Sequence, residues 1–236
     1  AGKVLNDMHA ISLRDSRSFN EIKNLGISKP DIYVTSDPAI LLDPSDNSYV
    51  EALMNAENVP SDKPLVGFSI RRWADSGYLD QIAKSADYCV DKFDAHPLFI
   101  PMQYPMDFEI SESIRSKMKH DSSIITGTYT PEVILGLTSK LELMVGMRLH
   151  SIIYAANRCV PLIGLVYEPK VGAFLNEIGQ PSAGYTDKLD YEEICRQLDY
   201  IWENREKTKT QLCESKKRLT IMSNANIMTA YDLLKN

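Results

Sequence analysis

The chain has 236 residues, a formal net charge of −6, 44% hydrophobic and 25% charged residues. This length and composition predict a globular protein of one or two domains. They exclude a transmembrane helix, since no apolar run approaches ~20 residues, and the acidic balance argues against general nucleic-acid binding. The start has neither a long apolar signal region nor an initiator Met, so we expect a processed or truncated chain.

Residues 1–42 contain few elements. The pattern predicts the end of a helix at 4–8, a strand at 10–13, a helix that stops at Gly26, and a strand at 32–35 closed by Asp37 and Pro38. Asp and Pro side by side are typical of a turn. Two strands and a helix are too few for a complete domain.

Residues 43–62 predict a linker with one helix, and a regular alternation follows over residues 63–190. The expected strands are 65–70, 97–102, 122–126, 141–145 and 160–166, and the expected helices are about 78–93, 108–119, 131–139, 149–157 and 170–178. Alternating strands and helices with short links predict an α/β fold with a doubly wound parallel sheet. Residues 191–236 are expected to form helices.

The stretch 146–170 carries the most chemistry. Arg148 and His150 follow one expected strand, and Lys170 follows the next. In a βαβ unit both strands end at the same edge of the sheet, where open α/β sheets bind ligands. Two permanent cations and an imidazole at one edge predict an anionic substrate and proton transfer.

Each of these three residues also has a structural interpretation. His150 could be a core histidine bonded to a backbone carbonyl, Arg148 an ion-pair partner, and Lys170 a solvated surface residue. The four cysteines form no CxxC pair, which favours free thiols in a reducing compartment. The sequence has no P-loop, no GxGxxG after a strand and no GxSxG elbow.

The motifs GMRLH at 146–150 and YEPK at 167–170 resemble those of the polysaccharide pyruvyl transferases. Further similar segments are ISLRDSRSF at 11–19, TSDPAILL at 35–42, FSIRRW at 68–73 and FIPM at 99–102. The nearest-looking members attach ketal pyruvate to cell-wall polysaccharide. One departure is Glu168, where the family pattern leads us to expect Asp.

The resemblance implies a Rossmann-like domain like the C-terminal half of a GT-B-type fold, with residues 1–42 as the remnant of an N-terminal α/β domain. It implies phosphoenolpyruvate as donor, a glycan or lipid-linked sugar as acceptor, and no metal or other cofactor. It also implies a location in the cytoplasm or at the inner face of the cell membrane.

The resemblance further assigns roles to residues. His150 would act as acid or base, Arg148 would hold the donor's carboxylate or phosphate, and Lys170 would neutralise the leaving phosphate. Further substrate-binding positions are expected at Arg14, Arg71, Leu149 and Glu168. Two alternatives stay open: a nucleotide-sugar glycosyltransferase on the same fold, and a glycan-binding fragment without catalysis.

Overall fold

The computed structural model describes residues 2–73 and 77–235. The chain divides into two compact units. One consists of Ala1–Leu41 together with Glu214–Asn236, and the other is Leu42–Cys213. The first unit therefore draws on both ends of the chain.

The first unit is built on two parallel strands. Its elements are α1 (Gly2–Asn6), β1 (Ala10–Leu13), α2 (Ser16–Asn24), β2 (Asp31–Val34), η1 (Pro38–Leu41) and the part of α10 (Arg205–Lys235) that begins at Glu214. Asn226 on α10 accepts hydrogen bonds from the hydroxyls of Ser12 and Thr35, and Ser36 Oγ donates to Leu219 O at 2.7 Å. The end of α10 is thus an integral part of this unit.

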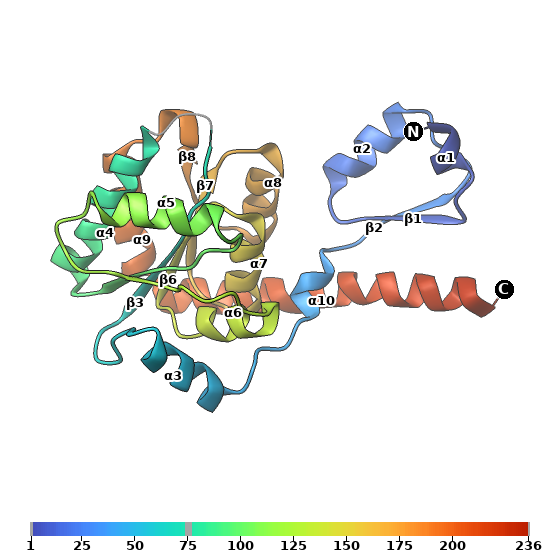
Figure 1. The fold of residues 1–236 in the computed structure, drawn as a ribbon. Helices are drawn as coiled ribbons and strands as arrows, with labels where there is room; N and C mark the ends of the chain where they lie inside the picture. The colour runs from blue at the N-terminus through green and yellow to red at the C-terminus, as the bar shows by residue number, and fades with distance from the viewer. Residues whose placement is uncertain (1, 74–76, 236) are drawn as a thin grey trace. The chain divides into compact units, whose positions relative to one another are not determined.

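The second unit is a six-stranded parallel sheet with helices on both faces (Figure 1). After α3 (Asn47–Ala56) its elements are β3 (Leu65–Ser69), α4 (Tyr78–Phe93), β4 (His96–Phe99), α5 (Met106–Arg115), β5 (Ser123–Ile124), α6 (Pro131–Thr138), β6 (Leu143–Gly146), α7 (Leu149–Asn157), β7 (Leu162–Val166), α8 (Pro169–Ile178), β8 (Ser182–Tyr185), η2 (Thr186–Lys188) and α9 (Tyr191–Glu203). The strand order is β5-β4-β3-β6-β7-β8. The chain runs outward from β3 in one direction and then crosses to β6, so the topological switch lies between β3 and β6.

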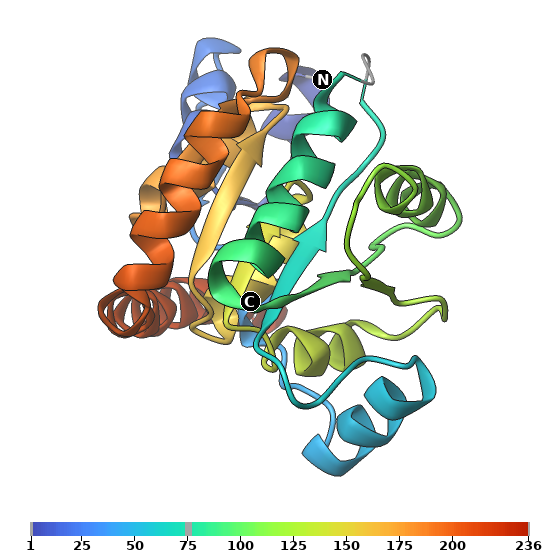
Figure 2. The same ribbon diagram turned by 90° about the vertical axis from the view of Figure 1, so that its left-hand side faces the viewer.

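Each face of the sheet has its own helices. Phe68, Val145 and Ile163 share a buried apolar cluster with residues of α4, α5 and α9, and α4 and α9 lie side by side in Figure 2. On the other face, α7 packs on β6 and β7, α8 packs on β7, and α6 lies beside α7. A Cβ added at Gly146 would lie 2.7 Å from Ile152 Cγ1, so the glycine lets α7 pack directly on the end of β6.

Most expected elements are present, with shifted ends. The expected strand 97–102 is His96–Phe99 and the expected strand 122–126 is only Ser123–Ile124, while helices 78–93 and 149–157 have the expected bounds. β8 (Ser182–Tyr185) has no counterpart among the expected strands. It is a short edge strand, and its pairing with β7 is interrupted by a register shift. A strand this short and irregular shows little alternation of apolar and polar residues in the sequence.

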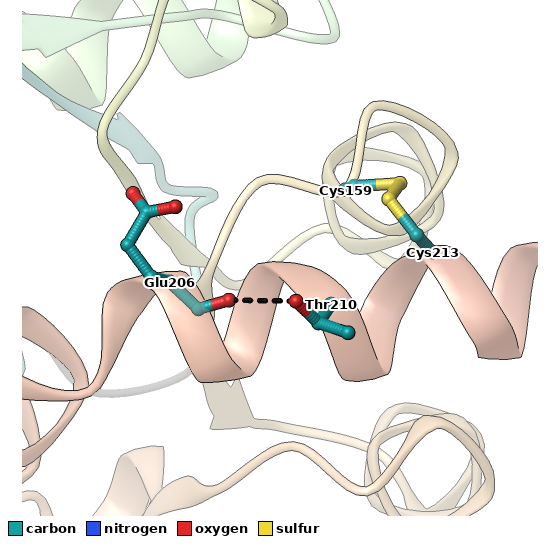
Figure 3. The surroundings of a disulfide bond; sticks show 4 residues. All are labelled: Cys159, Glu206, Thr210 and Cys213. Atoms are coloured by element: carbon teal, nitrogen blue, oxygen red, sulfur yellow. Dashed lines mark hydrogen bonds between the residues drawn. A yellow bond between two sulfur atoms is a disulfide. The ribbon is translucent and has the colours of Figure 1, made fainter.

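The expectation of four free thiols is wrong. Cys159, just after α7, forms a disulfide with Cys213 on α10 (Figure 3). The two are 54 positions apart and their Cα atoms lie 5.1 Å from each other, so their pairing is invisible to any motif based on spacing. Cys89 and Cys195 are free and buried.

No helix in the described part of the chain is long and apolar enough to span a bilayer. The 31-residue α10 has the length, but polar and charged side chains recur along it.

Candidate active site

The candidate active site lies at the carboxyl edge of the sheet, where β3, β6 and β7 end side by side. Ser69 at the end of β3 is in register with Gly146 of β6, which in turn is in register with Gly164 of β7. The segments that leave these strands carry Arg71, Arg148 with His150, and Lys170. The topological switch between β3 and β6 is the position where doubly wound sheets bind their ligands.

Arg148 makes a bidentate ion pair with Asp107 at the start of α5. Its Nη2 donates to Asp107 Oδ1 at 2.6 Å and its Nε to Oδ2 at 2.9 Å. The Asp107 carboxylate is fully buried, and it also accepts the backbone N–H groups of Met102 and Gln103. One edge of the guanidinium is therefore committed to the protein itself, as the ion-pair interpretation of Arg148 anticipated.

The other edge of Arg148 remains open. Nη2 reaches Gln103 Oε1 at 2.8 Å, while Nη1 makes no hydrogen bond within residues 2–73 and 77–235. The Arg148 side chain keeps 18% of its surface exposed. Nη1 is thus the atom of Arg148 that can meet an incoming anion.

Arg71 and Lys170 are brought together by one aromatic ring. The guanidinium of Arg71 lies 4.6 Å from the centre of the Tyr167 ring, and Lys170 Nζ lies 5.8 Å from the same centre. Trp73 packs edge-on against Tyr167 at 4.9 Å and lies 5.4 Å from the Arg71 guanidinium. Arg71 follows β3 and Lys170 follows β7, the two neighbours of β6 in the sheet, and both cations make a cation–π contact with the Tyr167 ring.

A hydrogen-bonded tyrosine fixes the turn that carries Arg71. Tyr78 Oη donates to Arg71 O at 2.7 Å and accepts from Trp73 N at 3.0 Å. Burial raises the pKa of Tyr78, which keeps its hydroxyl protonated and able to donate. The backbone of Arg71 is thereby set in place independently of its side chain.

Lys170 also pairs with Glu168. The two groups are 2.5 Å apart, and their side chains are 40% and 36% exposed. Such an exposed pair contributes little to stability, so a bound anion can replace Glu168 as the partner of Lys170 at small cost. Glu168 is the N-terminal flanking residue of α8 and makes no side-chain cap there.

Two helices begin at this edge without side-chain caps. Arg148 precedes α7 and Glu168 precedes α8, and neither side chain bonds to the free N–H groups of its helix. Uncapped N-termini offer backbone donors and a positive dipole end to an anion. Leu149 is 8% exposed, so it can contribute its backbone rather than its side chain.

His150 is exposed at the first turn of α7. Its ring centre lies 6.3 Å from that of Tyr154, one turn further along the helix. It is not the buried core histidine that the structural interpretation allowed. The exposed imidazole after the end of β6 is accessible to a ligand and to water.

Arg14 belongs to the other unit. There its Nη1 pairs with Asp37 Oδ2 at 2.9 Å, and Asp37 Oδ1 accepts the N–H of Ala39. The interpretation of Asp37 as a turn residue is confirmed.

Three residues of the site have no expected role from the sequence: Asp107, Trp73 and Tyr167. Asp107 and Arg148 are 41 positions apart, and no local pattern joins them. Trp73 and Tyr167 lie within the FSIRRW and YEPK segments, two and three positions from the cations Arg71 and Lys170, so an aromatic residue close in sequence to a strand-end cation is the available signal. Among the described residues, no group of His, Cys, Asp and Glu side chains is placed to hold a metal ion.

The model of one protein family, polysaccharide pyruvyl transferase, matches residues 1–169. The chain belongs to this family. The resemblance to this family is thereby confirmed, and the matched residues include the whole GMRLH motif and end one position before Lys170. Among curated protein sequences, no relative matches the chain.

Solved structures with the same fold have low sequence identity. The UDP-GlcNAc 2-epimerase of Neisseria meningitidis, bound to UDP-GlcNAc, superposes with a TM-score of 0.69 at 17% identity, covering 94% of this chain and 60% of the epimerase. Anabaena HepE in complex with UDP-glucose gives 0.64 at 11% identity, covering 98% and 66%. A glycosyltransferase from Rickettsia africae gives 0.62 at 15% identity, covering 100% and 67%.

These likenesses concern the fold. The expected class, a doubly wound parallel sheet resembling the C-terminal half of a GT-B-type fold, is confirmed. The chain spans about two thirds or less of the length of these three structures.

Proposed function

We propose that this protein transfers the pyruvyl group of phosphoenolpyruvate to a sugar of a cell-surface polysaccharide or of its lipid-linked precursor. The product is a cyclic ketal, and phosphate is released. The observation that carries the proposal is the pairing of Arg71 and Lys170 over Tyr167, beside two uncapped helix N-termini, in a chain of this family. Phosphoenolpyruvate bears a carboxylate and a phosphate, and this edge offers two separate groups of donors for them.

In the proposed complex, Arg71 and Lys170 hold the phosphate above the start of α8. The carboxylate lies toward Arg148 Nη1 and the first N–H groups of α7. Charge-assisted hydrogen bonds of this kind are about twice as strong as neutral ones, and they fix the orientation of the donor. Lys170 exchanges Glu168 for the phosphate on binding.

The reaction requires one net proton transfer to carbon. Protonation of C3 gives C2 oxocarbenium character, and the oxygen of one sugar hydroxyl forms a bond to C2. The C2–O bond to phosphate then breaks, and the second hydroxyl of the same sugar closes the ketal. The two sugar hydroxyls release two protons in total. One replaces the proton that was added to C3, and the other leaves with phosphate.

His150 is the proposed proton carrier. Its imidazole is exposed at the edge where the donor would lie, and a general acid or base of this kind contributes roughly 10²–10⁴-fold to a rate. Arg71 and Lys170 stabilise the phosphate as negative charge develops on it. The donor is a cytoplasmic metabolite, so we place the reaction in the cytoplasm, at the inner face of the membrane when the acceptor is lipid-linked.

The test uses the full-length protein, phosphoenolpyruvate and a panel of saccharide acceptors. We expect phosphate release to depend on the acceptor and to match the appearance of a ketal methyl signal in the proton NMR spectrum. Thermal shift with phosphoenolpyruvate and with UDP-sugars provides the comparison with the glycosyltransferase alternative. Stabilisation by UDP-sugars alone, with no ketal formed, would overturn the proposal.

A further inference from the structure

A small pocket opens at the carboxyl edge beyond the candidate donor site. It is formed by the segments that follow β4 and β5 and by one side of α6 and α7, and its volume is about 110 Å³. Three tyrosines line it: Tyr104, Tyr129 and Tyr154. This volume is below the range of about 300–1,000 Å³ for drug-sized ligands, so the pocket suits a single small ring.

The pocket lining is aromatic and uncharged. Met102, Thr128 and Ile134 complete the walls around the tyrosines, and no described lining residue is acidic or basic. By contrast, the pocket beneath the start of β3 is lined by Glu51, Lys63, Lys140 and Glu142. Tyrosine presents an apolar ring face and a hydroxyl, which together match the C–H face and the hydroxyls of a pyranose. The chemistry therefore favours a neutral sugar over an anion.

One wall of the pocket is held rigidly. The Tyr129 hydroxyl donates to Glu57 Oε1 at 2.5 Å, and Glu57 also accepts Thr126 N at 2.9 Å and Gly127 N at 3.0 Å. A Cβ at position 127 would lie 2.5 Å from the Tyr129 ring, so Gly127 lets the ring lie directly on the backbone. The hydroxyl of Tyr129 is thus occupied, and the residue offers its ring to a ligand.

Another part of the pocket lining, Met102 and Tyr104, belongs to a segment that is hydrogen-bonded to the candidate active site. Met102 N and Gln103 N donate to Asp107, and Arg148 holds both Asp107 and the side chain of Gln103. Tyr104 is therefore carried by a segment that Arg148 braces. From the inner side, Tyr154 lies one helical turn after His150, with 6.3 Å between their ring centres.

We infer that this pocket binds the sugar ring of the acceptor. The inference rests on the proposed function, which needs a neutral hydroxyl-bearing substrate next to a charged donor. A pyranose seated between Tyr104 and Tyr154 directs hydroxyls toward His150, while the cation-lined segment near Arg71 and Lys170 receives the donor. The two substrates are separated by charge, one on each side of Arg148.

Methionine methyl NMR on the full-length protein tests the site directly, because Met102 lines the pocket. The methyl signal of Met102 is assigned with Met102→Leu, and Met144, buried in β6, is the internal control. The probes are methyl hexopyranosides and methyl 2-acetamido-2-deoxyhexopyranosides. We expect at least one probe to shift the Met102 signal and leave Met144 unchanged. No Met102 shift across the panel, or equal shifts at both residues, overturns the inference.

A variant separates this inference from the proposed function. Tyr104 is 53% exposed, so Tyr104→Ala should fold, and Tyr185→Ala, at a 62% exposed tyrosine on β8, is the matched control. We expect Tyr104→Ala to raise the KM for the acceptor roughly tenfold, with unchanged affinity for phosphoenolpyruvate. If Tyr104→Ala still forms ketal and its KM for the acceptor is unchanged, the assignment of the pocket as the acceptor site is overturned, while the proposed function stands. A Met102 shift in a protein that neither binds phosphoenolpyruvate nor forms ketal overturns the proposed function alone.

Discussion

Arg148 and Asp107 form a bidentate ion pair that joins the start of α7 to the start of α5. The two contacts are 2.6 and 2.9 Å long, and the Asp107 carboxylate has no exposed surface. Through the N–H groups of Met102 and Gln103, the same carboxylate organises the segment after β4. Arg148 is therefore both a brace for the site and, through Nη1, a proposed ligand of the donor.

This pair should be costly to break. Arg148→Ala should lower the free energy of unfolding by about 3–5 kcal/mol, since it leaves the fully buried Asp107 carboxylate without its partner, and Asp107→Ala should cost less, because the Arg148 side chain is 18% exposed. The double variant should cost clearly less than the sum, as interacting partners are not additive. Urea unfolding of the four proteins measures the coupling. Simple additivity would show that the pair contributes nothing.

The ion pair also affects how variants at position 148 should be interpreted. Arg148→Glu would set a second carboxylate beside the buried Asp107, so loss of donor binding could result from unfolding. Arg148→Lys keeps the charge but loses the planar guanidinium that binds a carboxylate through two N–H donors. Melting curves must therefore accompany any binding measurement on these variants.

Arg71 and Lys170 offer a cleaner test of the donor site. Arg71→Gln and Lys170→Gln should each weaken phosphoenolpyruvate binding by roughly tenfold or more, because a charge-assisted contact contributes about 1.5–3 kcal/mol. The control is Arg72→Gln, at the position next to Arg71. It removes an exposed cation whose Nη2 lies 3.7 Å from Glu109 Oε2. Titration calorimetry gives the affinities. Equal losses in all three variants would indicate only a general charge effect.

The disulfide should stabilise the second unit. It closes a loop of 54 positions, which in the chain-entropy model corresponds to roughly 4 kcal/mol. We expect Cys213→Ser, or reduction of the wild type, to lower the melting temperature. Reduction of the Cys213→Ser variant should have no further effect. An unchanged melting temperature on reduction would mean that the two thiols are not bonded in the protein.

Tyr129 should give the pocket wall a pH dependence at high pH. The hydrogen bond to Glu57 raises the pKa of Tyr129 from its ordinary 10.0 to about 12. The folded state therefore holds this proton more tightly, so the contribution is complete below pH 10 and is lost as pH rises toward 12. Tyr129→Phe should cost about 1.5–3 kcal/mol of unfolding free energy below pH 10, and the difference from wild type should shrink above it. A difference that grew with pH would contradict this assignment.

The central sheet could be predicted from sequence because its signals are local. Apolar runs such as 141–145, followed by helical patterns, identify buried parallel strands without any knowledge of distant contacts. Arg71, Arg148, His150 and Lys170 were found in the same way, since a strand end is visible in the sequence. Their placement at one sheet edge then follows from the parallel topology.

The partners of those residues could not be predicted. The Arg148–Asp107 pair, the Cys159–Cys213 disulfide and the meeting of Arg71 with Tyr167 all join segments far apart in the chain. The order of the strands in the sheet determines which segments meet. The hydrophobic periodicity of one strand does not indicate which strands lie beside it. The edge strand β8 was missed for a different reason, because its pattern is short and irregular.

The most direct test of the proposed function is ketal formation by His150→Gln in the full-length protein. His150 is exposed, so the variant should keep the wild-type melting temperature, and His120→Gln removes a second imidazole, one that pairs with Asp91, as control. We expect His150→Gln to form ketal from phosphoenolpyruvate and acceptor roughly 10²–10⁴-fold more slowly than wild type, with the control unaffected. Transfer within about tenfold of wild type would contradict the role of His150 as the proton carrier.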